Sequence, residues 1–308
     1  MELRDIEYFA VIAEHGNLRR ASEALGLSPP ALSKSLGRLE QSMQAKLVER
    51  TPKGVALTPV GSALLAQVRR LRVTLRDIKR EAEDLSQGRA GHLRIGVGAT
   101  TVEDLPEAYA ALLKEAPRLT GQIIVADNDV MVPALCDGEL DLIFNVIPEF
   151  PYEGCVQEEL FDDEFVVCAS ADHRLAKRKR VTMADLAQEE WALSVPTVLN
   201  VQRVYRAFRD SGLPPPRVAI EARPVPLRLQ ICAATNLLSF NARRMLQQVA
   251  PRFRLKELPV EELKWRRPFG VIYRKEAYLS PAARRLIQVL KAAGPQPARL
   301  TPARSSLP

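Results

Sequence analysis

Two adjacent prolines interrupt a run of helical apolar spacing in ASEALGLSPPALSKSLGRLE, residues 21–40. Gly26 readily takes the left-handed conformation that ends a helix, so a first helix is expected to stop there. Ser28 is a favoured N-cap, and Pro29 at the first helical position has no N–H to leave unpaired, so a second helix should start at once. The stretch therefore predicts two short helices joined by a tight turn.

The second of these helices is expected to be amphipathic. Its apolar positions recur at steps of four and three, at Leu32, Leu36 and Leu39. The opposite face is polar, basic or small, with Pro30, Ser33, Lys34, Gly37 and Arg38. This is the arrangement of a helix-turn-helix, whose second helix enters the major groove of DNA. An ordinary helical hairpin is the alternative that these residues leave open.

The surroundings favour a DNA-binding domain. Residues 2–15 have apolar spacing typical of a third helix, and LVERTPKGVALT, residues 47–58, predicts a hairpin with Lys53 at its tip, which would form a wing. Residues 19–80 contain 13 Lys and Arg against 4 Asp and Glu. Such a surplus of positive charge suits the neutralisation of phosphates.

A long helix is predicted from Thr58, an N-cap, and Pro59 to about Ser86. Its apolar positions alternate in steps of four and three, at Leu64, Val68, Leu71, Leu75, Ile78, Ala82 and Leu85. This heptad pattern favours a two-helix coiled coil and hence a dimer, with a helix packed on its own chain as the alternative. Residues 86–91 then indicate a hinge.

From residue 92 the pattern changes to strands alternating with helices, which predicts a parallel α/β layout. The predicted strands are LRIGVG, QIIVAD, LDLIFNV, EFVVCAS, RVAIEA, NLLSF and PFGVIYR. The predicted helices cover 103–116, 130–137, 201–210, 227–234 and 281–292. The last strand and helix should return to the first of two lobes, since no partner for them remains in the second.

Several functional classes find no support in the sequence. No run approaches twenty apolar residues and the N-terminus does not resemble a signal peptide, so no membrane partner and a cytoplasmic location are expected. Three histidines and four cysteines have no metal-ligand spacing, although a cysteine pair brought together by the fold could sense redox state. No nucleophile or phosphate-binding motif is present. We therefore expect no catalytic residue, no metal and no cofactor, and we expect that the protein is not an enzyme.

The chain resembles the LysR-type transcriptional regulators. The matching stretches are LRDIEYFAVIAEHGNLRRASEALGLSPPALSKSLGRLE, LVERTPKGVALTPVG, GHLRIGVG, DGELDLIFNV and PRVAIEARPVPLRLQICAATNLL, which together reach from residue 1 to about 292. The family usually has Gln at the position of Pro29 and a bulkier residue at that of Gly37. Pro29 offers no side-chain hydrogen bond to a base, so the operator sequence cannot be taken from relatives.

The resemblance implies an N-terminal winged helix-turn-helix domain and a bilobal, doubly wound α/β effector domain like periplasmic binding proteins. The expected parts are the DNA-binding domain at 1–58, the dimerising linker helix and hinge at 59–91, the first lobe at 92–164 and 268–292, the second lobe at 165–267, and a disordered tail at 293–308. The implied function is sequence-specific transcriptional regulation controlled by a small molecule bound between the lobes.

Residues in both parts are expected to carry this function. For DNA we expect Ser28, Pro29, Pro30, Ser33, Lys34, Arg38, Arg50 and Lys53, with Ser33 and Lys34 at base edges and Arg38, Arg50 and Lys53 at phosphates. Ligands of doubly wound lobes bind beyond the carboxyl ends of the strands. That rule and the resemblance select Thr100, Thr101, Val102, Asn128, Asn145, Val146, Leu199, Asn200, Val201, Gln202 and Phe240 for the effector.

The Thr100–Thr101 pair precedes a predicted helix, which suits an anion, so a carboxylate is one candidate effector. Thr101 as a mere cap of that helix is nearly as well supported. The expected macromolecular partners are operator double-stranded DNA and a second copy, in a homodimer or homotetramer, and RNA polymerase is a further candidate. The rival functions are a regulator without an effector and, less favoured, an α/β enzyme with an appended DNA-binding domain.

The two lobes have opposite charge. In the first lobe, residues 92–164 contain 3 basic and 16 acidic residues and residues 268–292 add 5 basic and 1 acidic, whereas residues 165–267 of the second lobe contain 19 basic and 9 acidic ones. One explanation is that these charges lie on solvent-exposed faces and belong to no interface. The resemblance implies an antiparallel dimer of effector domains, which would set each acidic lobe against a basic one and speed association.

Overall fold

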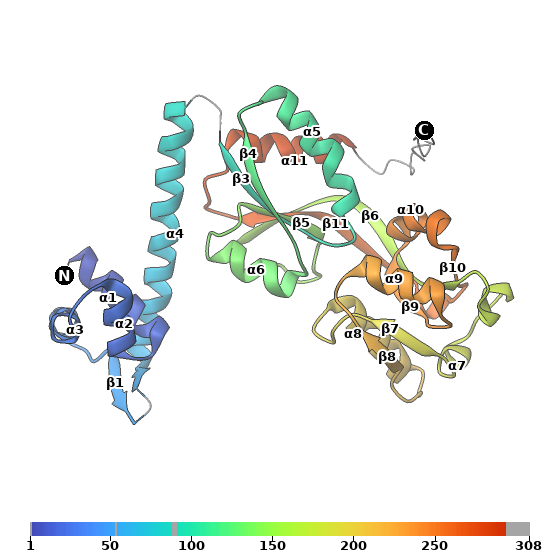
Figure 1. Ribbon diagram of the computed structural model, residues 1–308, viewed down its shortest axis with the longest axis horizontal. Coiled ribbons are helices and arrows are strands. Elements are labelled where there is room, and N and C mark those ends of the chain that lie inside the picture. The colour runs from blue at the N-terminus through green and yellow to red at the C-terminus, as the bar shows by residue number, and fades with distance from the viewer. Residues whose placement is uncertain (1, 53, 88–90, 294–308) are drawn as a thin grey trace, which may run out of the picture. The chain divides into compact units, whose positions relative to one another are not determined.

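The computed structural model describes residues 2–52, 54–87 and 91–293 and contains two compact units, Met1–Lys79 and Arg80–Pro308 (Figure 1). Each unit has its own hydrophobic core. The predicted tail beyond Ala293 and the hinge residues 88–90 lie outside the described residues. No helix in the described ranges combines the length and apolar character needed to span a bilayer.

The N-terminal unit is a winged helix-turn-helix. Its elements are α1 (Leu3–His15), α2 (Leu18–Leu25), α3 (Pro29–Met43), β1 (Val48–Thr51), β2 (Gly54–Leu57) and the start of α4 (Pro59–Gln87). The two strands pair antiparallel and form the wing. The core includes Phe9, Ile12, Leu32, Leu39 and Leu47, all with no exposed surface. The apolar face predicted for the second helix is thus the buried face of α3.

Local chemistry fixes the helix ends in this unit as predicted. Gly26 ends α2 with φ of 64°, and Ser28 caps α3 by accepting a hydrogen bond from the N–H of Ala31 at 3.4 Å. At α4, the hydroxyl of Thr58 accepts from the N–H of Gly61 at 3.0 Å and donates to the carbonyl of Lys46 at 2.7 Å. The start of α4 is therefore anchored to the segment that leads into the wing.

The apolar positions along α4 divide into two sets. Leu64 and Val68 pack into the core of the N-terminal unit, and Val68 is only 3% exposed. Leu71, Leu75 and Ile78 are 39%, 41% and 56% exposed. These exposed apolar side chains at heptad spacing are available to pack against a second helix. The coiled coil stays a prediction.

The C-terminal unit is built on a seven-stranded sheet of order β10-β6-β11-β5-β3-β4, with β9 also paired to β6. In the first lobe, β3 (His92–Val97) lies between β4 (Thr120–Val125) and β5 (Leu142–Val146), and the three strands are parallel. Two long antiparallel strands, β6 (Cys155–Ser170) and β11 (Trp265–Arg274), run from the first lobe into the second. The chain thus crosses between the lobes twice, as predicted.

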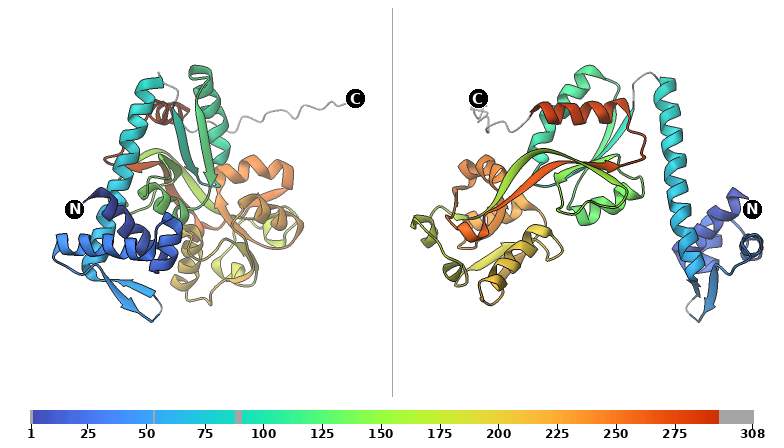
Figure 2. Two further views of the ribbon diagram at one scale, coloured as in Figure 1. Left: turned by 60° about the vertical axis from the view of Figure 1, so that its left-hand side comes forward. Right: turned by 180° about the vertical axis from the view of Figure 1, so that it is seen from behind.

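Helices cover both faces of the first-lobe sheet (Figure 2). They are η1 (Val102–Asp104), α5 (Leu105–Glu115), α6 (Asn128–Cys136) and α11 (Pro281–Ala293). Leu93, Ile95 and Phe144 face the core beneath α5 and α11, whereas Ile143 and Ile272 pack with α6 on the other face. Strand alternation therefore gives this lobe two cores on one sheet.

The second lobe surrounds Trp191, which is fully buried and contacts Phe208 edge-on. Its elements are η2 (Arg174–Lys177), α7 (Met183–Leu186), β7 (Glu190–Leu193), α8 (Leu199–Asp210), β8 (Arg217–Glu221), α9 (Val225–Ala234), β9 (Ser239–Ala242), α10 (Arg243–Phe253), β10 (Leu255–Glu257) and η3 (Glu261–Leu263). Strands β7 and β8 form a separate parallel pair.

Three expectations for this unit need correction. The strand predicted in NLLSF is β9, which begins only at Ser239, because Leu238 makes an isolated bridge to Trp191 instead. The strand predicted at 164–170 starts at Cys155, since its acidic first half pairs with β11. The elements α7, β7, α10 and β10 were not predicted from the sequence, because each is short or strongly polar.

Candidate functional site

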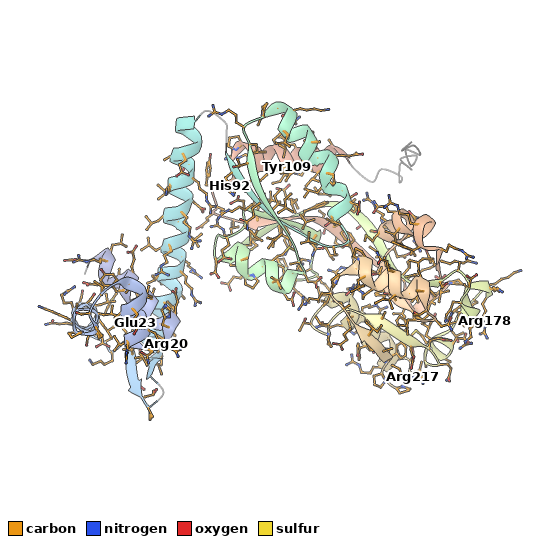
Figure 3. The ribbon with its side chains drawn as sticks, in the orientation of Figure 1. Arg20, Glu23, His92, Tyr109, Arg178 and Arg217 are labelled. Atoms are coloured by element: carbon orange, nitrogen blue, oxygen red, sulfur yellow. The ribbon has the colours of Figure 1, made fainter. Side chains whose placement is uncertain are left out.

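The N-terminal residues of α3 form one exposed surface. Ser28, Pro29, Pro30 and Lys34 are exposed, and Ser33 is partly exposed. Leu32, Ser35 and Leu36 are buried, whereas Ser33 and Lys34 between them reach the surface. This is the face that a helix-turn-helix presents to the major groove. Arg20 on α2 is also exposed in this unit (Figure 3).

Arg38 is held in place by Asp5 of α1. The guanidinium lies 2.6 Å from the Asp5 carboxylate, which also accepts a hydrogen bond from the hydroxyl of Ser35. Burial acts to raise the pKa of Asp5, but the hydrogen bonds from Arg38 and Ser35 together lower it below its usual value. The side chain of Arg38 is still 44% exposed. It is therefore oriented by α1 while part of it stays available to solvent.

The wing residues proposed for phosphate contact are only partly described. The backbone of Arg50 lies in β1 and pairs with Val55. The Arg50 side chain and the whole of Lys53 lie outside the described part of the chain.

A cavity of about 200 Å³ lies between the two lobes of the C-terminal unit. The first lobe contributes residues that follow β3 and β4 or end β5: Ala99, Thr100, Asp127, Asn145 and Val146. The second lobe contributes Ser194 after β7, Arg223 after β8, and the first turns of α8 and α9. The cavity thus lies at the carboxyl ends of parallel strands from both lobes.

Six of the residues expected at an effector site line this cavity: Thr100, Asn128, Asn145, Val146, Leu199 and Asn200. The two asparagines contact each other. The amide of Asn145 donates to Asn128 at 2.8 Å, and the amide of Asn128 donates to the carbonyl of Val146 at 3.1 Å. Gly98 leaves room for this pair, because a Cβ there would lie 1.9 Å from Oδ1 of Asn145.

The other five expected residues do not line the cavity: Thr101, Val102, Val201, Gln202 and Phe240. The Thr101 hydroxyl is buried and donates to the carbonyls of Gly98 and Phe144, so it neither caps η1 nor reaches the cavity. Val102 packs on the first-lobe core, and Val201 and Phe240 lie in the second-lobe core. Gln202 lines a larger neighbouring groove along α8.

An ion-pair cluster that was not predicted from the sequence joins the two lobes across the cavity. Arg223 of the second lobe lies 3.1 Å from Asp127 and 3.0 Å from Asp129, both in the first lobe. The Thr197 hydroxyl also donates to Asp129, at 3.2 Å. Burial raises the pKa of Asp127 despite Arg223, whereas the hydrogen bond from Arg223 lowers that of Asp129. Asp127 directly follows a predicted strand, which is the signal that could have found it.

The described residues were expected to lack a metal site and a redox-active cysteine pair. They contain no group of three or more His, Cys, Asp or Glu side chains that could hold a metal ion. All four cysteines are free thiols. Cys136 and Cys155 lie near each other, but burial raises the pKa of Cys155 to about 11, which makes its thiolate scarce at neutral pH.

Comparison with known proteins agrees with this architecture. Residues 3–62 match the family of bacterial regulatory helix-turn-helix proteins, lysR family, and residues 86–295 match the LysR substrate binding domain. The HTH-type transcriptional regulator GbpR of Azospirillum brasilense is 30% identical over 296 residues, which covers 95% of this chain and 86% of that protein.

Two solved structures share the fold. Full-length CbnR, crystallised with its target DNA, has a TM-score of 0.62 at 22% identity and covers 96% of this chain and 100% of that chain. The regulatory domain of CcmR from Synechocystis PCC6803, in complex with 2-PG, has a TM-score of 0.60 at 20% identity and covers 66% of this chain and 97% of that chain. The chain belongs to the LysR family of DNA-binding transcriptional regulators with an effector-binding domain.

Proposed function

We propose that this regulator binds operator DNA through the exposed face of α3 and the wing, and that a small molecule in the cavity between the lobes controls that binding. The observation that carries the proposal is the convergence of polar residues from five strand ends on one cavity between the lobes. A regulatory domain of the same fold crystallised with a small molecule supports an effector of modest size.

The test is a calorimetric screen of the full chain against small metabolites, followed by DNA binding on a fragment that the protein itself selects from random DNA. We expect a compound that binds without being turned over and that changes DNA affinity. A regulator without an effector would keep one DNA affinity with every compound, and an α/β enzyme would convert the compound.

Replacing Asn128 with alanine is expected to weaken effector binding about tenfold while leaving DNA affinity unchanged. The substitution removes the partner of Asn145 and exposes the carbonyl of Val146 to the cavity. Titration calorimetry and fluorescence anisotropy on DNA would measure the two affinities. An unchanged effector affinity would move the site away from this cavity.

We further propose that the effector domains of two copies pair antiparallel, the acidic first lobe of one against the basic second lobe of the other. Arg178 and Arg217 are among the basic residues of the second lobe (Figure 3). Such attraction chiefly speeds encounter and is screened beyond about 8 Å at physiological ionic strength. Stopped-flow association of the full chain should therefore slow markedly as salt rises, and a rate indifferent to salt would contradict the charge argument.

A further inference from the structure

Three polar atoms without hydrogen-bond partners lie on residues that line the same cavity. They are the hydroxyl oxygen of Ser194, Oδ1 of Asn200 and Nε of Arg228, and all three are buried within the described residues. Buried polar groups in folded proteins are nearly always hydrogen-bonded, because leaving them unpaired costs free energy. The Ser194 hydroxyl and Nε of Arg228 can donate to a ligand, whereas Oδ1 of Asn200 can only accept, so these atoms indicate a polar ligand that carries both a hydrogen-bond acceptor and a donor.

Arg228 on α9 also lacks a close counter-charge. Its side chain is only 2% exposed, and its terminal nitrogens donate to neutral acceptors: the carbonyls of Ala222 and Arg223 and Oδ1 of Asn241. No carboxylate of the described residues lies within ion-pair distance of it. Burial lowers the pKa of the guanidinium, opposed by the more distant charge of Asp127. Buried cations are normally paired, so an anion is expected beside Nε.

The start of α8 adds to this preference for an anion. This helix has twelve residues, its N-cap is Val198, and no side chain caps it. Leu199 and Asn200 of its first turn line the cavity, where the N–H groups and the positive end of the helix dipole favour negative charge.

The volume of the cavity and the acidic residues that line it limit the ligand further. The cavity measures about 200 Å³, and one of about 150 Å³ holds benzene, so roughly six to ten non-hydrogen atoms fit. Phe165, Val225 and Trp265 give the cavity apolar walls. Asp127 and Asp129 share the single cation Arg223, and their excess negative charge opposes each further carboxylate on a ligand.

We propose that the effector is a small monocarboxylate whose carboxylate binds between Nε of Arg228, the hydroxyl of Ser194 and the first turn of α8. This rests on the proposed function of the cavity as the effector site. It replaces the Thr100–Thr101 pair expected from the sequence, because the Thr101 hydroxyl is already used by backbone carbonyls. The hydroxyl of Ser194 then contributes to ligand binding rather than to folding.

The first test uses Ser194→Ala, with Ser239→Ala as the matched control for stability. The Ser194 hydroxyl has no partner, so its removal should leave the melting temperature of the free protein unchanged or raised. It should weaken carboxylate binding roughly 10- to 100-fold, as expected for a lost hydrogen bond to a charged group. The Ser239 hydroxyl donates to the carbonyl of Ala192 and accepts from Asn241, so its loss should lower the melting temperature by about 2–6 °C.

Calorimetry of the full chain with cyclohexanecarboxylate, 3-hydroxybutyrate and their two amides tests the ligand class. Carboxylates that bind wild type while the amides do not, and that bind Ser194→Ala and Arg228→Lys much more weakly, would support the proposal. Amides that bind as tightly as carboxylates, no binding by either carboxylate, or Ser194→Ala binding like wild type would each overturn it. Neutral compounds that bind wild type but not Asn128→Ala would contradict carboxylate binding at Arg228 and Ser194. The cavity would then still be the effector site.

Discussion

Replacing Gly61 with alanine is expected to destabilise the N-terminal unit by about 3 kcal/mol or more and to abolish DNA binding near its melting temperature. A Cβ at Gly61 would lie 1.9 Å from the carbonyl oxygen of Leu47, which belongs to the backbone and cannot rotate away. The same carbonyl accepts a hydrogen bond from the N–H of Thr58 at 3.0 Å. The added methyl group would therefore separate α4 from the segment before the wing.

Gly37→Ala is the matched control for this prediction. Gly37 lies inside α3 on its exposed face, and a Cβ there would have no neighbour within 4 Å. Alanine should stabilise the helix by up to about 1 kcal/mol, so the two substitutions should have opposite signs. Thermal unfolding followed by circular dichroism measures both. A Gly61→Ala variant that melts with wild type would show that α4 does not start as described.

Lys34→Ala is expected to cost about 1–3 kcal/mol of DNA affinity and to relax preference at one position of the operator. Lys34 lies on the exposed face of α3, beside the first turn that a helix-turn-helix directs at base edges. Anisotropy measurements on a set of single-base variants of the selected DNA would give both the affinity and the preference.

Lys53→Ala provides the contrast. For Lys53 the sequence predicts a phosphate contact, so its loss should weaken all DNA sequences alike and reduce the slope of log K against log salt by about one. If both variants lost sequence preference equally, the assignment of Lys34 to bases and Lys53 to phosphate would be wrong.

The helix boundaries near the N-terminus could be predicted because local chemistry determines them. Gly26, Ser28 and Thr58 act through their own conformational preference or through bonds to residues within a turn. Strands whose partners are remote in sequence were harder to predict. The first half of β6 is acidic and has no apolar run, and it is a strand because it pairs with β11 about a hundred residues later.

Cavity-lining residues were likewise predictable only in part. Thr100 and Thr101 are neighbours at the end of β3, yet only Thr100 lines the cavity, because the backbone turns the Thr101 hydroxyl toward strand carbonyls. No spacing rule distinguishes the two. Arg223 and Arg228 could not be predicted either, because their roles depend on how the second lobe faces Asp127 and Asp129.

Occupation of the cavity between the lobes is expected to be coupled to DNA binding by the winged domain. Thermodynamic reciprocity requires that DNA then changes ligand affinity by the same factor by which the ligand changes DNA affinity. The most direct measurement is titration calorimetry of a cavity ligand into the full chain, free and saturated with its selected DNA. We predict dissociation constants that differ at least about fivefold between the two titrations. Equal dissociation constants for the free and the DNA-saturated protein, with ligand binding observed in both titrations, would contradict this coupling.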